Sequence, residues 1–114
     1  MSGNERSTWL FMRLSAVVLL FAALGHLLYM HLGVGVENID YDWVLARWSS
    51  PVWRLYDWFL LTFAVAHGAV GVRTIMSDYL PGGASALAAR WLLYVAAIAI
   101  LMMGTQIVLT APTP

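Results

Sequence analysis

The chain has 114 residues, of which 61% are hydrophobic and 11% are charged, and its six acidic residues balance its six basic ones. Soluble domains carry about 25% charged residues, and a small soluble domain can bury only part of its apolar surface. The composition therefore excludes an ordinary soluble domain and indicates a membrane protein, with no reason to expect a nucleic-acid partner. The absence of cysteine excludes disulfides, thiolate-bound metals and iron–sulfur ligation on this chain.

The first predicted element is an apolar helix over about residues 10–34. Residues 14–36 contain no Asp, Glu, Lys or Arg, which gives the roughly 20 apolar residues that a hydrocarbon core requires. This run is longer than the apolar part of a signal peptide, which has about 7–15 residues. We therefore expect a retained membrane-spanning helix.

Two further helices are predicted over about residues 52–78 and 86–110. Pro51 suits the first turn of the second helix, and the LPGG sequence at 80–83 ends it. Residues 91–114 are again free of charged side chains. There is no internal repeat or second domain, so we predict an all-α membrane protein with one domain over residues 1–114 and three transmembrane helices.

The distribution of arginine predicts the orientation in the membrane. Three acidic residues lie on the connection between the first two helices, whereas four arginines lie near the N-terminus and the second connection: Arg6, Arg13, Arg73 and Arg90. The positive-inside rule then places the N-terminus in the cytoplasm. Because transit-peptide composition is absent, we expect a multi-pass protein of the bacterial inner membrane. Aromatic residues typical of an interfacial belt gather near the start of the second helix: Trp43, Trp48, Trp53, Tyr56 and Trp58.

Small residues on the second helix indicate that it packs closely against something. Ala64, Gly68 and Gly71 would let another backbone approach in the membrane, where shape matching drives association. They would equally let a flat cofactor lie against the helix. We therefore expect a membrane partner protein rather than an isolated three-helix bundle.

His67 is the central candidate for a functional residue. At about 100° per residue it shares a helical face with Gly71, Thr74 and Asp78. A histidine near the middle of a membrane helix is costly and is by default a functional hypothesis. It could ligate haem iron, relay a proton or form a hydrogen bond between helices. The nearby glycines favour haem, because they remove side chains that would collide with a porphyrin.

Asp78 and Tyr79 lie where the second helix reaches the cytoplasmic interface. A phenol can donate a hydrogen bond to a quinone carbonyl, and a neighbouring carboxylate can orient the phenol or supply protons. The alternative is an interfacial aromatic residue beside a solvated helix end. Arg73 could neutralise a haem propionate or Asp78, or could serve only as a positive-inside anchor.

Taken together, these residues resemble a known family. The RLYD sequence at 54–57, His67, ten intervening residues, Asp78-Tyr79 and a third apolar helix resemble the small, D-type membrane-anchor subunit of succinate dehydrogenase, respiratory complex II. The resemblance implies one half of a heterodimeric membrane-anchor helix bundle. It also implies four kinds of partner or cofactor: a flavoprotein subunit with FAD, an iron–sulfur subunit with its clusters, a larger anchor subunit, and haem b with ubiquinone or menaquinone.

The resemblance also implies a role for each candidate residue. His67 would be one axial ligand of haem b, with the other from the larger anchor subunit, and Tyr79 would bind quinone with support from Asp78. Succinate would be oxidised on another chain, so this chain carries no catalytic residue and is not an enzyme alone. For His26 three roles stay open: a hydrogen bond to a haem propionate, ligation of a second haem, or a buried structural histidine.

The sequence also allows two other functions, and it does not determine which quinone is used, the number of haems or the presence of additional small subunits. The chain could be a purely structural anchor without cofactor contact, or a small proton-conducting membrane subunit. The direction of the reaction, and whether the complexes form a trimer, are left open.

Overall fold

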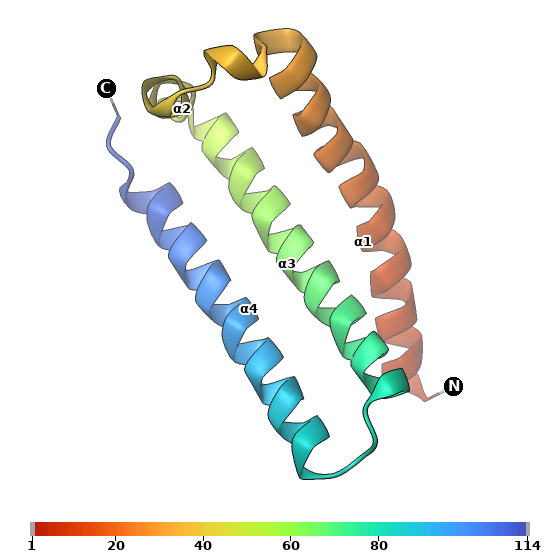
Figure 1. Ribbon diagram of the computed structural model, residues 1–114. Helices are drawn as coiled ribbons and strands as arrows, with labels where there is room; N and C mark the ends of the chain where they lie inside the picture. The colour runs from red at the N-terminus through yellow and green to blue at the C-terminus, as the bar shows by residue number, and fades with distance from the viewer. Residues whose placement is uncertain (1, 114) are drawn as a thin grey trace.

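The computed structural model describes residues 2–113, which contain helices and no strand. Helix α1 spans Gly3–Leu28 and continues as a π-helix over Tyr29–Val34, which a 3-10 turn at Val36–Asn38 follows. A short helix α2 spans Tyr41–Arg47, and two long helices follow, α3 at Pro51–Tyr79 and α4 at Ala84–Thr110 (Figure 1). The predicted all-α class is confirmed.

Three helices in the described range are long and apolar enough to cross a membrane: Gly3–Val34, Pro51–Tyr79 and Ala84–Thr110. Their apolar side chains face outward, as Leu32 and Leu109 do at 82% and 74% exposed. In water such exposure would oppose folding, whereas in lipid it costs nothing because the solvent is apolar. The predicted three-span arrangement is therefore confirmed.

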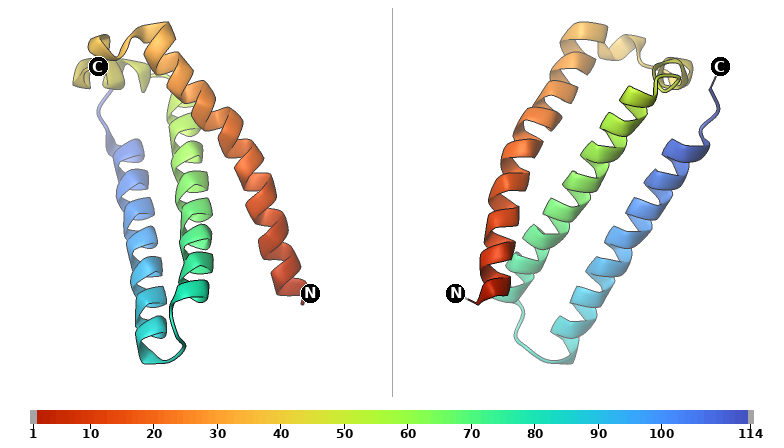
Figure 2. Two further views of the ribbon diagram at one scale, coloured as in Figure 1. Left: turned by 45° about the vertical axis from the view of Figure 1, so that its right-hand side comes forward. Right: turned by 180° about the vertical axis from the view of Figure 1, so that it is seen from behind.

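Helix α3 lies between α1 and α4 and packs against both (Figures 1 and 2). The N-terminus and the α3–α4 connection lie at one end of the molecule, and α2 and the C-terminus lie at the other (Figure 1). Helix α1 crosses α3 obliquely and diverges from it toward the N-terminus (Figure 2). The second and third helices were predicted within a few residues of their observed bounds.

Two local features differ from the prediction, and each has a capping residue as its cause. Helix α1 begins at Gly3 rather than near residue 10, because Ser2 and Glu5 form a reciprocal capping box. Helix α2 was not predicted; the Asp40 carboxylate begins it by accepting a hydrogen bond of 2.8 Å from the Trp43 backbone N–H.

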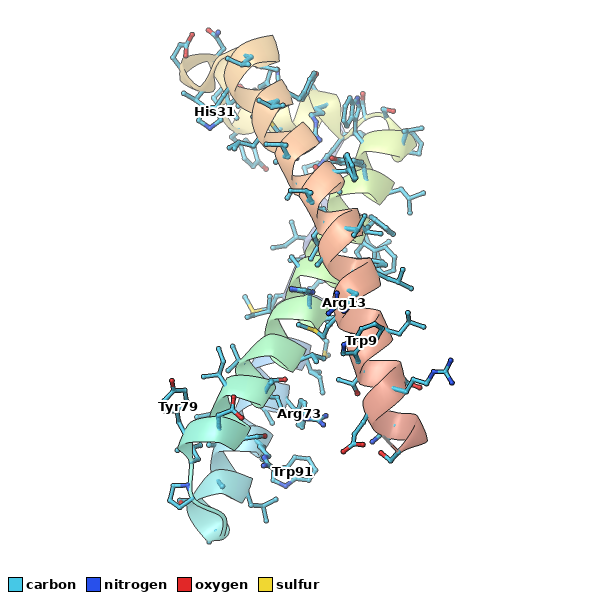
Figure 3. The ribbon with its side chains drawn as sticks, turned by 90° about the vertical axis from the view of Figure 1, so that its right-hand side faces the viewer. Trp9, Arg13, His31, Arg73, Tyr79 and Trp91 are labelled. Carbon is cyan, nitrogen blue, oxygen red and sulfur yellow. The ribbon has the colours of Figure 1, made fainter. Side chains whose placement is uncertain are left out.

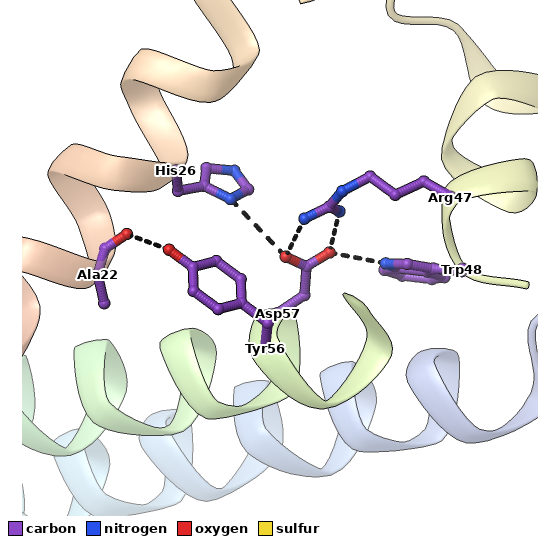
Figure 4. Close-up of polar contacts among 6 residues, drawn as sticks. All are labelled: Ala22, His26, Arg47, Trp48, Tyr56 and Asp57. Carbon is purple, nitrogen blue, oxygen red and sulfur yellow. Dashed lines mark hydrogen bonds and ion pairs between the residues drawn. The ribbon is translucent and has the colours of Figure 1, made fainter. Parts of the chain in front are cut away.

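A cluster that we call the polar junction joins α1, α2 and α3 at the α2 end of the molecule (Figure 4). The Asp57 carboxylate of α3 accepts hydrogen bonds from both terminal nitrogens of Arg47. It also accepts one of 2.7 Å from the Trp48 indole N–H. The Tyr56 hydroxyl donates to the Ala22 carbonyl on α1. The junction consists of His26, Arg47, Trp48, Tyr56 and Asp57.

Arg54, near the start of α3, connects this helix to the end of α4 by hydrogen bonds. Its two terminal nitrogens each donate to a carbonyl at the end of α4, that of Val108 and that of Ala111, both at 2.9 Å. A cation at a helix C-terminus is also favourable to the helix dipole. Three residues of the RLYD sequence therefore fasten α3 to the rest of the chain.

Candidate functional site

The histidine near the middle of α3 contacts α1. The Nδ1 atom of His67 lies 2.8 Å from the hydroxyl oxygen of Ser15. Ser15 is 1% exposed and is the largest fully buried side chain in the described range. Its hydroxyl also donates to the Met12 carbonyl, at 3.4 Å. The contact therefore joins α1 and α3 where they cross.

The other ring nitrogen of His67 has no such partner. In residues 2–113, the enclosed side-chain nitrogens and oxygens without a hydrogen bond are His26 Nδ1 and Arg47 Nε. The Nε2 atom of His67 is not one of them and forms no hydrogen bond there, so it reaches the surface of the chain. The imidazole is thus fixed on one side and available on the other.

The backbone beside His67 is also accessible. A Cβ atom added at Gly68 would meet no atom within 4 Å, and one at Gly71 would lie 3.7 Å from the Met12 methyl carbon. At Gly68 the space that a side chain would fill is therefore open. A flat group bound by the imidazole can lie against this backbone without displacing a side chain.

Helices α1 and α3 diverge toward the N-terminus (Figure 2). A groove of about 630 Å³ lies between them there. Met12 and Gly71 line it one helical turn from the Ser15–His67 contact, and Arg13 and Arg73 line it from the two facing helices (Figure 3). The guanidinium carbon of Arg13 lies over the Trp9 ring, 4.3 Å from the ring centroid. The groove also includes Glu5, so its two arginines and one carboxylate leave it with a net positive charge.

Arg73 lies between this groove and α4. One of its terminal nitrogens is 3.3 Å from the Tyr94 hydroxyl, to which it donates. Within residues 2–113 it forms no ion pair with Asp78. The structure therefore leaves its charge available to a bound anion.

Asp78 and Tyr79 occupy the last turn of α3 and are exposed, Tyr79 by 82%. Neither side chain forms a hydrogen bond within the described part of the chain. Tyr79 projects from α3 on the side away from Arg73 and Trp91 (Figure 3). About 18 Å separates it from His67 along the helix, at about 1.5 Å per residue. Both groups are thus presented outward, where another molecule can contact them.

His26 lies at the opposite end of α3 from these two residues. Its Nδ1 atom is 3.7 Å from an Asp57 oxygen, beyond hydrogen-bond distance, and its ring stacks on Tyr56 (Figure 4). Asp57 and His67 are about 15 Å apart along the helix. The structure therefore does not bring His26 and Arg73 together.

Ser15 and Arg13 were not predicted as site residues. Ser15 lies on the same face of the first helix as His26, but that face alone does not show which residue Ser15 contacts. Arg13 was interpreted only as an orienting charge. Their proximity to His67 depends on the register between α1 and α3, which neither helix specifies alone.

Comparison with known families gives one match. Residues 4–107 match the family described as the succinate dehydrogenase/fumarate reductase transmembrane subunit. A comparison with curated proteins finds no matching relative. The match includes most of each of the three membrane spans, together with Ser15, His67 and Tyr79.

Proposed function

Because the chain belongs to the succinate dehydrogenase/fumarate reductase transmembrane subunit family, we propose that it is the small, D-type anchor of such a complex and that His67 binds haem b. One observation carries the haem assignment. In mid-membrane, His67 is held through Nδ1 by Ser15, while Nε2 reaches the surface without a hydrogen-bond partner in the described range. That is the arrangement a metal-binding histidine requires, with one nitrogen oriented by the protein and the other free to bind.

The residues around His67 fit a haem. The open backbone at Gly68 leaves room for a planar ring. His67 would supply one ligand to the iron, and the larger anchor subunit would supply another. A bound haem b supplies a one-electron redox centre whose potential depends on its ligands and burial.

Two arginines suit the haem propionates. Arg13 and Arg73 line the groove beside His67, and guanidinium groups bind carboxylates well because their geometries match. Of the two predicted propionate contacts, Arg73 is therefore favoured over His26, which packs against Asp57 at the other end of α3.

The quinone site is proposed at the last turn of α3. The Tyr79 hydroxyl would donate a hydrogen bond to a quinone carbonyl, ubiquinone or menaquinone, and Asp78 would support it as an orienting group or a source of protons. The exposure of both side chains supports a site that partner subunits complete. Electrons would arrive there from the iron–sulfur subunit.

The proposed assembly has the N-terminus in the cytoplasm of a bacterial cell. The flavoprotein with FAD and the iron–sulfur subunit would then cover the end that carries the α3–α4 connection. The larger anchor subunit would cover apolar helix surface that this chain leaves exposed. Succinate would be oxidised on the flavoprotein. This chain would bind haem and quinone and pass electrons, without being catalytic alone.

A purely structural anchor is the second candidate, because the Ser15–His67 hydrogen bond also joins two helices. A His67→Ala variant of the purified complex separates the two functions. Haem b per flavin is measured from reduced-minus-oxidised spectra, and succinate oxidation with a soluble acceptor reports assembly.

We expect His67→Ala to lose haem b while the soluble-acceptor activity persists. His31→Ala is the control, because His31 is exposed near the end of the first span (Figure 3), and it should retain haem. Wild-type haem content in His67→Ala would reject ligation and leave the structural function.

A further inference from the structure

We propose that Ser15 is a positioning residue for the haem ligand, because its hydroxyl selects the ring form and orientation of His67 that present a bare Nε2 to iron. This inference rests on the proposed haem function and assigns a second residue of this chain to it. It depends on the direction of the Ser15–His67 hydrogen bond, on the burial of Ser15 and on the two states of the iron.

The first step is the direction of the hydrogen bond. The Ser15 hydroxyl has a single proton and two neighbours, the Met12 carbonyl at 3.4 Å and His67 Nδ1 at 2.8 Å. A carbonyl oxygen can only accept, and helical serines commonly donate to a carbonyl of the preceding turn. We infer that the proton of Ser15 lies toward Met12, so that its oxygen accepts from His67.

The second step follows from the chemistry of imidazole. If Nδ1 donates to Ser15, Nδ1 carries the one proton of the neutral ring, and Nε2 keeps its lone pair. This tautomer can bind iron through Nε2. The opposite tautomer would place a proton on Nε2 and block ligation.

The Ser15–His67 hydrogen bond is protected from water. Ser15 is 1% exposed, so water does not compete for its hydroxyl. Its small side chain also suits the point where α1 crosses α3, because small residues let membrane helices approach closely. The acceptor is thus built into the helix packing and does not depend on a partner subunit.

The fourth step concerns the iron. An acceptor on the outer nitrogen of a ligating histidine fixes the ring and makes it a stronger electron donor. Stronger donation stabilises the ferric form over the ferrous form, which lowers the midpoint potential. Removing the hydroxyl should therefore raise the potential and weaken haem retention.

The experiment compares Ser15→Ala, Ser15→Thr and Ser7→Ala in the purified complex. Ser7 is the control, because it lies on the same helix and, within residues 2–113, its hydroxyl bonds to the Gly3 carbonyl alone. The readouts are the haem midpoint potential by redox titration and the rate of haem loss in detergent, with bound flavin as the measure of assembly.

We expect Ser15→Ala to assemble, to show a more positive midpoint potential and to hold haem roughly tenfold more weakly, as outer-shell substitutions do at metal sites. Ser15→Thr, which keeps the hydroxyl, should stay close to wild type in both readouts, and Ser7→Ala should not differ. If Ser15→Thr fails to assemble, the Ser15→Ala result decides alone.

Unchanged potential and haem retention in Ser15→Ala, with haem still lost in His67→Ala, would overturn the role of Ser15 and leave the proposed function intact. Retention of haem in His67→Ala would overturn both. The two failures are therefore distinguishable.

Discussion

At the level of single residues, the imidazole of His67 has one nitrogen bonded to Ser15 and one that reaches the surface. A polar nitrogen left unpaired in an apolar environment costs about 1–3 kcal/mol. Coordination by iron removes that cost, whereas contact with lipid does not. The same ring therefore explains both why α1 packs where it does and why a cofactor would bind here.

A Gly68→Leu substitution tests the open backbone beside His67. Beyond the adjoining residues and the local helix backbone, no described atom lies within 4 Å of the added Cβ position. The fold should therefore tolerate the change, whereas the side chain would occupy the space of the porphyrin. Overpacking of about 1–3 kcal/mol would weaken haem binding roughly fivefold to a hundredfold. Haem per flavin measures the effect, with Ala99→Leu on the exposed side of α4 as control. Full haem content in Gly68→Leu would show that the porphyrin does not lie against Gly68.

A Tyr79→Phe substitution tests the quinone contact. Loss of one neutral hydrogen bond of about 1 kcal/mol should slow quinone reduction about fivefold, while succinate oxidation with a soluble acceptor continues. Tyr41→Phe is a matched control, because Tyr41 is also exposed but lies on α2 at the other end. An equal loss of both activities in Tyr79→Phe would indicate faulty assembly and not a lost quinone contact.

At the level of helices, the pattern of apolar residues predicted α3 and α4 well because their ends carry strong signals. Pro51 lies in the first turn of α3, and the turn at 80–83 separates the two helices. The start of α1 was placed too late, although the Ser2–Glu5 capping box was present in the sequence. Helix α2 was missed because its seven residues are too few for a clear period.

Gly104 of α4 packs against Leu61 of α3. A Cβ atom there would collide with the tip of the Leu61 side chain. Gly104→Val should therefore displace the Leu61 side chain and lower the stability of the complex by about 1 kcal/mol, the low end of the cost of overpacking. A thermal unfolding scan measures this, with Gly82→Val as control because a Cβ at Gly82 meets no atom within 4 Å. Equal unfolding temperatures for the two variants would contradict the close contact.

At the level of the whole molecule, the two ends of the chain have different tasks. The polar junction and Arg54 fasten the helices together at the α2 end, whereas the exposed Asp78 and Tyr79 lie at the end with the α3–α4 connection (Figure 1). We therefore expect substitutions in the junction to act on stability and those near α3–α4 to act on electron transfer.

Asp57→Ala tests this division. It would leave Arg47, which is 9% exposed, as a buried charge without its carboxylate partner. Breaking a buried pair in this way costs about 3–5 kcal/mol, so the yield and unfolding temperature of the complex should fall. The haem potential of the remaining complex should not change, since His67 is about 15 Å away along α3. Asp42→Ala, at an exposed position of α2, is the control. Wild-type stability in Asp57→Ala would show that the polar junction does not stabilise the fold.

The number of spans and the placing of the N-terminus and the α3–α4 connection at one end could be predicted from the sequence, because hydropathy and connectivity determine them. The meeting of Ser15 with His67 could not, because it depends on how far α1 slides along α3. The polar junction was equally hidden, since Arg47 reaches Asp57 only after α2 folds back (Figure 4). Apolar periodicity identifies inward faces, and tertiary packing decides which residues meet there.

The most direct measurement of the central claim is a cryo-EM map of the purified complex with its native lipids and cofactors. We expect haem iron bonded to Nε2 of His67, with Nδ1 of the same ring hydrogen-bonded to Ser15. A map in which both axial ligands come from another subunit, or in which His67 faces lipid, would contradict it.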